Sequence, residues 1–90
     1  MPYIKQEDRM RFESMVRTMN LTKIETAGEL NYLITQLTHA FVNQKLKKTY
    51  QNYNDAMGAM TGAQLEFYRR YVVPYENLKI VENGDVPEAK

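Results

Sequence analysis

Residues 49–74 read TYQNYNDAMGAMTGAQLEFYRRYVVP, and this stretch decides the fold. The hydroxyl of Thr49 can accept a hydrogen bond from a free backbone N–H in the first turn of a helix. Pro74 lacks a backbone N–H and disfavours the α conformation at Val73, so we expect the helix to end there. The stretch therefore predicts one long helix, and we expect the other segments to cover it.

Two rows of side chains run along this predicted helix. The first row is mainly apolar or aromatic and recurs at alternating spacings of four and three, which is typical of one face of an amphipathic helix. It consists of Tyr53, Met57, Met60, Gln64, Phe67 and Tyr71. The second row consists of small residues, Ala56, Ala59 and Ala63, with Gly58 and Gly62 beside it. Glycine costs roughly 1 kcal/mol relative to alanine within a helix. The small row therefore predicts close approach by another helix backbone, which is the commoner case, or by a flat ligand.

The composition bounds the class of protein. Ninety residues with 43% hydrophobic content predict a single globular domain, residues 1–90, with a modest core that often gains from self-association. The chain has no cysteine, which excludes disulfides and thiolate metal sites. A net charge of +1 disfavours a dedicated nucleic-acid binder. No apolar run is long enough for a membrane span, and there is no signal-peptide pattern, so we expect a cytoplasmic protein.

The remaining segments complete an all-α prediction. Residues 1–5 are expected to form an extended arm, residues 6–19 a first helix, and residues 85–90 a flexible tail, with a turn at Asn83-Gly84. A second helix is expected over residues 27–44, because Thr26 and Glu29 form a capping-box pattern at its start. We expect its buried stripe to comprise Leu30, Leu33, Ile34, Leu37 and Phe41. The predicted fold class is a small three-helix domain with a long central C-terminal helix, assembled as a homo-oligomer.

The sequence offers no catalytic pattern. The single histidine, His39, has no HExxH partner for a metal site. The carboxylates are scattered at no spacing that is typical of acid–base catalysis. There is neither a glycine-rich phosphate loop nor a GxSxG motif. We therefore expect a protein that is not an enzyme and that uses no cofactor and no metal.

Polar and aromatic residues near both ends of the predicted helices are candidates for ligand binding. Arginine matches phosphate or carboxylate oxygens, tyrosine can stack on a base, and amides can bond to base edges or ribose hydroxyls. An antiparallel hairpin of the second and third helices would bring several of them together. The alternatives are ordinary surface ion pairs to Glu66 for the arginines and helix-start hydrogen bonds for the amides. The candidates are Asn31, Tyr32, Asn52, Glu66, Tyr68, Arg69, Arg70 and Tyr75.

Four stretches resemble a family of small uncharacterised proteins that occur in phages and bacterial genomes. They read MPYIKQEDR at the start, GELNYLIT in the second helix, YQNYNDAMG at the start of the third, and LEFYRRYVVPYENLKIVENGDV at the end. The sequence departs from the family pattern in residues 45–48 and 57–62. The resemblance brings no settled activity. The matching positions are Tyr3, Glu29, Asn31, Tyr32, Asn52, Asn54, Glu66, Tyr68, Arg69, Tyr75 and Asp85.

The occurrence of this family in phages suggests a phage protein, and a phage-encoded chain would act in the cytoplasm of the bacterial host. By analogy with small phage proteins that sequester nucleotide immune signals, we expect a non-catalytic homo-oligomer that binds a nucleotide-like small molecule. The signal would be of the cyclic ADP-ribose type or a cyclic dinucleotide, and its capture would block host anti-phage defence. The alternative is a helical module for protein–protein interaction without a small ligand. A nucleic-acid accessory factor is the third and least favoured hypothesis.

Overall fold

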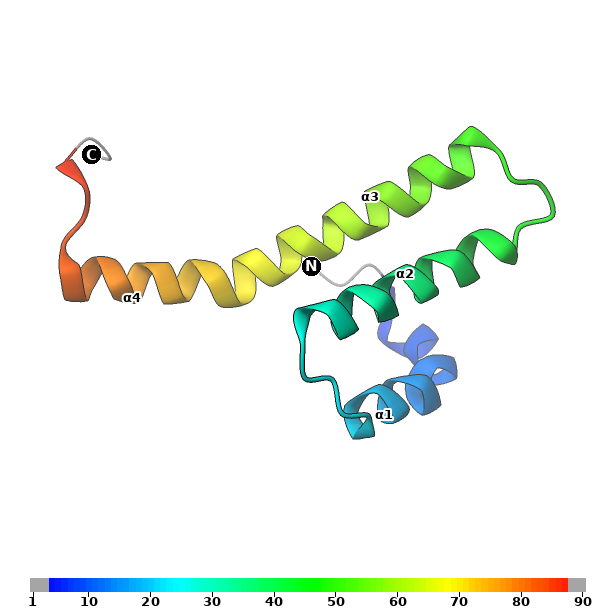
Figure 1. Cartoon of the computed structure of the whole chain (residues 1–90), viewed down its shortest axis with the longest axis horizontal. Helices are drawn as coiled ribbons and strands as arrows, with labels where there is room; N and C mark the ends of the chain where they lie inside the picture. Colours follow the sequence, from blue (N-terminus) through cyan, green and yellow to red (C-terminus); the bar gives the residue numbers. More distant parts are fainter. Residues whose placement is uncertain (1–3, 88–90) are drawn as a thin grey trace. The chain divides into compact units, whose positions relative to one another are not determined.

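The computed structural model describes residues 4–87, and these contain helices and no strand. The all-α class is therefore confirmed. In chain order the elements are η1 (Gln6–Phe12), α1 (Glu13–Leu21), α2 (Ala27–Asn43), α3 (Tyr50–Phe67), η2 (Tyr68–Val72) and α4 (Val73–Asn83) (Figure 1). Most of the expected arm (residues 1–3) and the end of the expected tail (residues 88–90) lie outside the described residues. The helices fall into two compact units, Met1–Gln44 and Lys45–Lys90, which we describe separately.

In the first unit, α2 begins where the sequence predicts. The backbone N–H of Glu29 donates to Thr26 Oγ1 at 3.1 Å, and Glu29 Oε1 accepts from the backbone N–H of Thr26 at 3.2 Å. This reciprocal pair is the predicted capping box. The first predicted helix is present as the 3₁₀ segment η1 followed by α1, which ends two residues later than expected, at Leu21.

In the second unit, α3 also begins as predicted, but the helix does not end at Pro74. Thr49 caps the start, where its Oγ1 accepts from the backbone N–H of Asn52 at 3.3 Å. Helical backbone then continues through η2 into α4, as one helix that Figure 1 shows in yellow and orange. Val73 keeps α-helical angles (φ −61°, ψ −49°) although it precedes a proline. The predicted helix end is therefore wrong, and the predicted turn at Gly84, with φ of 83°, is the true end.

The π-helical turn η2 explains how the helix passes Pro74. In a regular α-helix, the N–H at position 74 would bond to the carbonyl of Arg70, and a proline ring clashes with that carbonyl. In η2 the backbone widens instead, and the N–H of Val73 donates to the carbonyl of Tyr68, five residues earlier. Pro74 then lies at the second residue of α4, directly after the widened turn.

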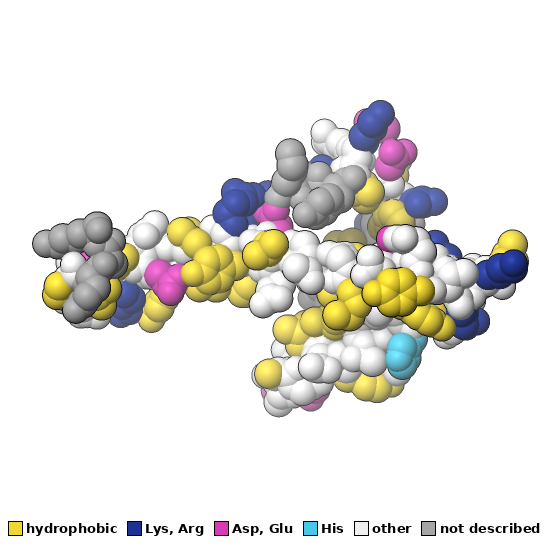
Figure 2. Space-filling model, turned by 90° about the horizontal axis from the view of Figure 1, so that it is seen from above, with side chains coloured by type: hydrophobic (Ala, Val, Ile, Leu, Met, Phe, Trp, Pro, Cys, Tyr) yellow, Lys and Arg dark blue, Asp and Glu magenta, His cyan; other side chains and the backbone are white. Residues whose placement is uncertain are grey.

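Neither unit has an apolar core of its own. Among residues 4–87, only Ala56 is buried. The stripe on α2 that the sequence predicts to be buried is exposed by 38% at Phe41 to 58% at Leu37, so its own unit does not bury it as predicted. Figure 2 shows apolar side chains, in yellow, spread over the surface in view. One or two helices per unit cannot surround such side chains, so another surface has to cover them.

Candidate anion-binding site

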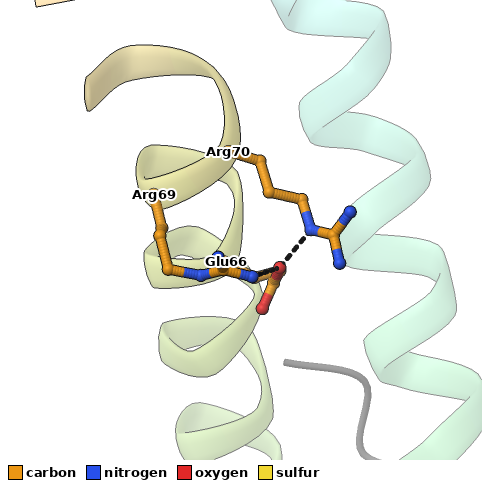
Figure 3. Close-up of polar contacts among 3 residues, drawn as sticks. All are labelled: Glu66, Arg69 and Arg70. Atoms are coloured by element: carbon orange, nitrogen blue, oxygen red, sulfur yellow. Dashed lines mark hydrogen bonds and ion pairs between the residues drawn. The ribbon is translucent and has the colours of Figure 1, made fainter. Parts of the chain in front are cut away.

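The clearest polar cluster of the second unit joins the end of α3 to η2. Arg69 Nη2 donates to Glu66 Oε1 at 2.7 Å, and Arg70 Nε donates to the same oxygen. Figure 3 shows both guanidinium groups turned toward this one carboxylate. The spacings of three and four residues put all three side chains on neighbouring positions of the helix surface. The sequence-based alternative, an ion pair of these arginines with Glu66, is therefore present.

The cluster still carries the charge and the donors that an anion needs. Two guanidinium cations face one carboxylate, so one positive charge remains uncompensated within the three side chains. A guanidinium has five N–H donors in a fixed fork, and the contact with Glu66 takes one from each arginine. Arg69 and Arg70 are 62% and 56% exposed, whereas the Glu66 side chain is only 23% exposed. The arginines are accordingly the groups that an incoming anion would reach.

A second contact crosses Pro74. The hydroxyl of Tyr68 donates to Glu76 Oε1 at 2.9 Å, eight residues along the chain. This hydrogen bond, together with the negative charge of Glu76 and a smaller effect of burial, raises the pKa of Tyr68 above its usual value near 10. The contact joins η2 to α4 and restricts the orientation of the Tyr68 ring. Tyr68 directly precedes Arg69 in the sequence.

The raised pKa of Tyr68 gives a testable pH dependence. Because the folded protein holds this phenol proton more tightly than the unfolded chain, the contact contributes stability fully below pH 10, and this contribution is lost as pH rises through the folded pKa. Glu76→Gln should lower the pKa of Tyr68 and make one of the seven tyrosines ionise earlier in an ultraviolet phenolate titration. Glu82→Gln, which removes a carboxylate paired with Lys79, should leave the titration unchanged. An unchanged curve for Glu76→Gln would contradict the contact.

The other aromatic side chains of this helix lie in local pairs. The ring centroids of Phe67 and Tyr71 are 5.0 Å apart, with an interplanar angle of 32°. The Tyr75 ring has Lys79 Nζ 5.5 Å from its centroid, within the range of a cation–π contact. Tyr75 remains 60% exposed, so its ring is accessible to a stacking partner.

The amide candidates have local partners. Asn52 Nδ2 donates to the carbonyl of Lys47 at 2.6 Å, which ties the start of α3 to the preceding turn. This is the helix-start role that the sequence left open for it. On α2, Thr35 Oγ1 donates to the backbone carbonyl of Asn31 at 2.9 Å and has Asn31 Oδ1 as a more distant second acceptor at 3.4 Å. Tyr32, also on α2, is 62% exposed and borders a shallow, mainly apolar hollow of about 370 Å³ with Ile24 and Leu33.

The structure thus brings together some predicted site residues and adds two that the sequence analysis did not select. Glu66, Tyr68, Arg69, Arg70 and Tyr75 lie within one helical stretch, whereas Asn31 and Tyr32 belong to the other unit. Glu76 and Lys79 are the additions. A helix assumed to continue past Pro74 would have suggested Lys79, because a spacing of four residues places it beside Tyr75. Glu76, eight residues from Tyr68, reaches it across the π-helical turn.

In the part of the chain that the structure describes, no helix has the length and apolarity that a membrane crossing requires. No cluster of three or more His, Asp or Glu side chains able to hold a metal occurs within residues 4–87.

Neither the curated proteins nor the solved structures contain a match to this chain. A family model does match, over residues 1–86, and the chain therefore belongs to the family described as a domain of unknown function, DUF6899.

Proposed function

We propose that this protein is a non-catalytic, self-associating binding protein for a small phosphate-bearing ligand of the nucleotide type. The observation that carries the proposal is the pair of exposed guanidinium groups on one carboxylate, Arg69 and Arg70 on Glu66. Arginine forks bind phosphate oxygens through paired N–H donors. In this proposal Glu66 holds both arginines in place, and a phosphate takes the remaining donors.

The aromatic side chains on the same helix would bind the base of the nucleotide, while the arginines bind its phosphate. Tyr68 and Tyr75 are 47% and 60% exposed, and both have a polar or charged neighbour that fixes the ring. A base can stack on such a ring at little cost in side-chain entropy, because a tyrosine has few rotatable bonds. Asn31, Tyr32 and Asn52 remain in the proposal as further contacts to a ribose or a base edge.

The finer proposal concerns the ligand's role. We propose that the protein is encoded by a phage and sequesters a nucleotide-derived immune signal, of the cyclic ADP-ribose type or a cyclic dinucleotide, in the cytoplasm of its bacterial host. Such a role requires tight binding of the ligand without its chemical conversion. The sequence has no recognisable catalytic pattern, which is compatible with this role. The resemblance to a family whose members occur in phages as well as in bacterial genomes supports the phage origin.

A second candidate is a helical module that binds another protein. It is favoured by the apolar stripes, which stay exposed in both units. In that case Arg69, Arg70 and the tyrosines would be covered by the partner, and no small anion would bind.

Isothermal titration distinguishes the two candidates. We expect heat of binding with a nucleotide or a cyclic nucleotide signal, weaker binding of pyrophosphate and inorganic phosphate, and weakening of all of them by added salt, because exposed charges are screened. Adenosine, which has the base and ribose but no phosphate, is the matched control and should bind least. The absence of binding heat with every compound in the series would reject a phosphate-bearing ligand and leave the protein-interaction module.

A further inference from the structure

We infer that α3 packs antiparallel against α3 of a second copy of this chain, about a twofold axis that passes close to Gly62. This inference rests on the self-association in the proposed function, but it does not depend on the ligand. The surface involved is the first row of the sequence analysis, which we call the seam: Tyr53, Met57, Met60, Gln64, Phe67 and Tyr71.

The seam forms one exposed face of the helix. Tyr53, Met57 and Tyr71 are 47%, 61% and 65% exposed. Tyr71 lies in η2, and its ring contact with Phe67 shows that the seam keeps its direction up to the π-helical turn. Spacings of four and three are those of a coiled-coil seam, in which each side chain inserts between residues of a facing helix.

The seam is its own complement when it is reversed. About a centre at residue 62, Tyr53 faces the partner's Tyr71, Met57 faces the partner's Phe67, and Met60 faces the partner's Gln64. An aromatic pair therefore closes each end, with sulfur–aromatic contacts inside them. A face that pairs with itself through a twofold axis forms a closed dimer, the commonest symmetry of soluble oligomers.

Charge favours the antiparallel direction over the parallel one. Residues 50–63 carry Asp55 as their only charged side chain, which gives this half of the helix a charge of −1. Residues 64–73 carry Glu66, Arg69 and Arg70, which gives the other half a charge of +1. Antiparallel pairing places the negative half of one copy beside the positive half of the other, whereas parallel pairing aligns like halves. The preference is small, because Asp55 and Arg69 lie on the face opposite the seam, where salt screens their charges.

The area is also sufficient for a stable pair. Aromatic side chains bury roughly 150–250 Å² each, and the seam presents three of them with two methionines on each copy, all partly exposed. Because these side chains are about half exposed, the two copies together supply on the order of 1,000 Å² from them, which is about the area that a specific protein interface has to exceed. Residues beside the seam add to this area.

Arg69 lies on the face opposite the seam, whereas Arg70, three residues from Phe67, lies beside it. Arg69 is two residues from Phe67 and from Tyr71, and a step of two residues turns about 200° around an α-helix. Covering the seam therefore leaves Arg69 exposed. Loss of pairing and loss of anion binding can consequently be measured independently of each other.

Cysteine cross-linking in the full chain tests the arrangement, because the chain has no cysteine of its own. Tyr53→Cys and Tyr71→Cys are made as separate variants and oxidised alone and after mixing. Antiparallel pairing predicts a disulfide dimer in the mixture and none in either variant alone, since like positions would lie 18 residues apart, about 27 Å. The matched control is a mixture of Asp55→Cys with Arg69→Cys, at mirrored positions on the opposite face, which should stay uncross-linked.

Three outcomes would overturn the inference. Cross-linking of either variant alone would mean parallel pairing. Cross-linking of the control mixture to the same extent would mean random collision. A folded monomer of the unmodified chain by analytical ultracentrifugation would mean that the seam is covered within one chain. A cross-linked antiparallel dimer that ignores every phosphate ligand would instead keep the inference and reject the proposed ligand.

Discussion

Replacing Pro74 by alanine should raise the free energy of unfolding by up to about 3 kcal/mol and abolish the hydrogen bond between Tyr68 and Glu76. The gain follows because a proline within a helix costs about this much, here through its missing N–H and the widened turn that avoids its clash with a carbonyl. An alanine N–H could bond to the carbonyl of Arg70, and the π-helical turn could then close to a regular α-helix. Closing it would rotate α4 relative to α3 and separate Tyr68 from Glu76.

Two measurements check this expectation. Chemical denaturation should show the higher stability, and the phenolate titration should show the pKa of Tyr68 falling toward its usual value. Pro87→Ala, a change beyond the end of α4, is the matched control and should alter stability by no more than about 0.5 kcal/mol. A Pro74→Ala protein that is less stable and keeps the raised pKa of Tyr68 would show that the π-helical turn has a cause other than Pro74.

Arg69→Ala should weaken binding of a phosphate-bearing ligand by roughly tenfold to a hundredfold, because a hydrogen bond to a charged group contributes about 1.5–3 kcal/mol. The same change should cost the fold less than about 1 kcal/mol, since the pair with Glu66 is solvent-exposed on the arginine side. Titration calorimetry gives the first value and chemical denaturation the second.

Two further variants control the Arg69→Ala experiment. Arg69→Lys keeps the charge but loses the fork, so it should bind with intermediate affinity. Arg17→Ala removes an exposed arginine from α1 and should leave binding unchanged. If Arg69→Ala melts the protein while the ligand affinity of the folded fraction stays the same, Arg69 is a structural ion pair and the proposed site is wrong.

The helix starts could be predicted from the sequence because they depend on neighbouring residues. Thr26 with Glu29, and Thr49 with the N–H of Asn52, need only three residues to form their hydrogen bonds. The predicted turn at Gly84 is equally local, since a positive φ suits glycine. These elements matched the prediction to within a residue or two.

The helix end at Pro74 could not be predicted by the same rule. The rule assumes that a proline meets a regular α-helix, whereas here the preceding turn widens and removes the clash. The sequence also could not show that its own unit leaves the α2 stripe exposed, because a periodic pattern shows which face is apolar but not which surface covers it. A chain whose partner surface lies outside itself gives the same pattern as a chain with its own core.

The candidate site was predictable in part. Glu66, Arg69 and Arg70 are brought together by helical spacing alone, so the sequence was enough to place them. The role of Asn52 was left open between a ligand contact and a helix-start hydrogen bond, and the structure shows the hydrogen bond to Lys47. Glu76 and Lys79 were not selected because both follow Pro74, where the helix was expected to end.

Native mass spectrometry of the unmodified protein, mixed with cyclic ADP-ribose isomers, cyclic dinucleotides and common nucleotides, tests the central claim most directly. The claim is that a homo-oligomer of this helical chain holds a nucleotide-type ligand and does not alter it. We expect an oligomer with one ligand at a regular ratio of ligand to subunits, and a released ligand of unchanged mass. A monomer, or an oligomer that carries none of these compounds, would contradict the claim, and a released ligand of changed mass would show an enzyme.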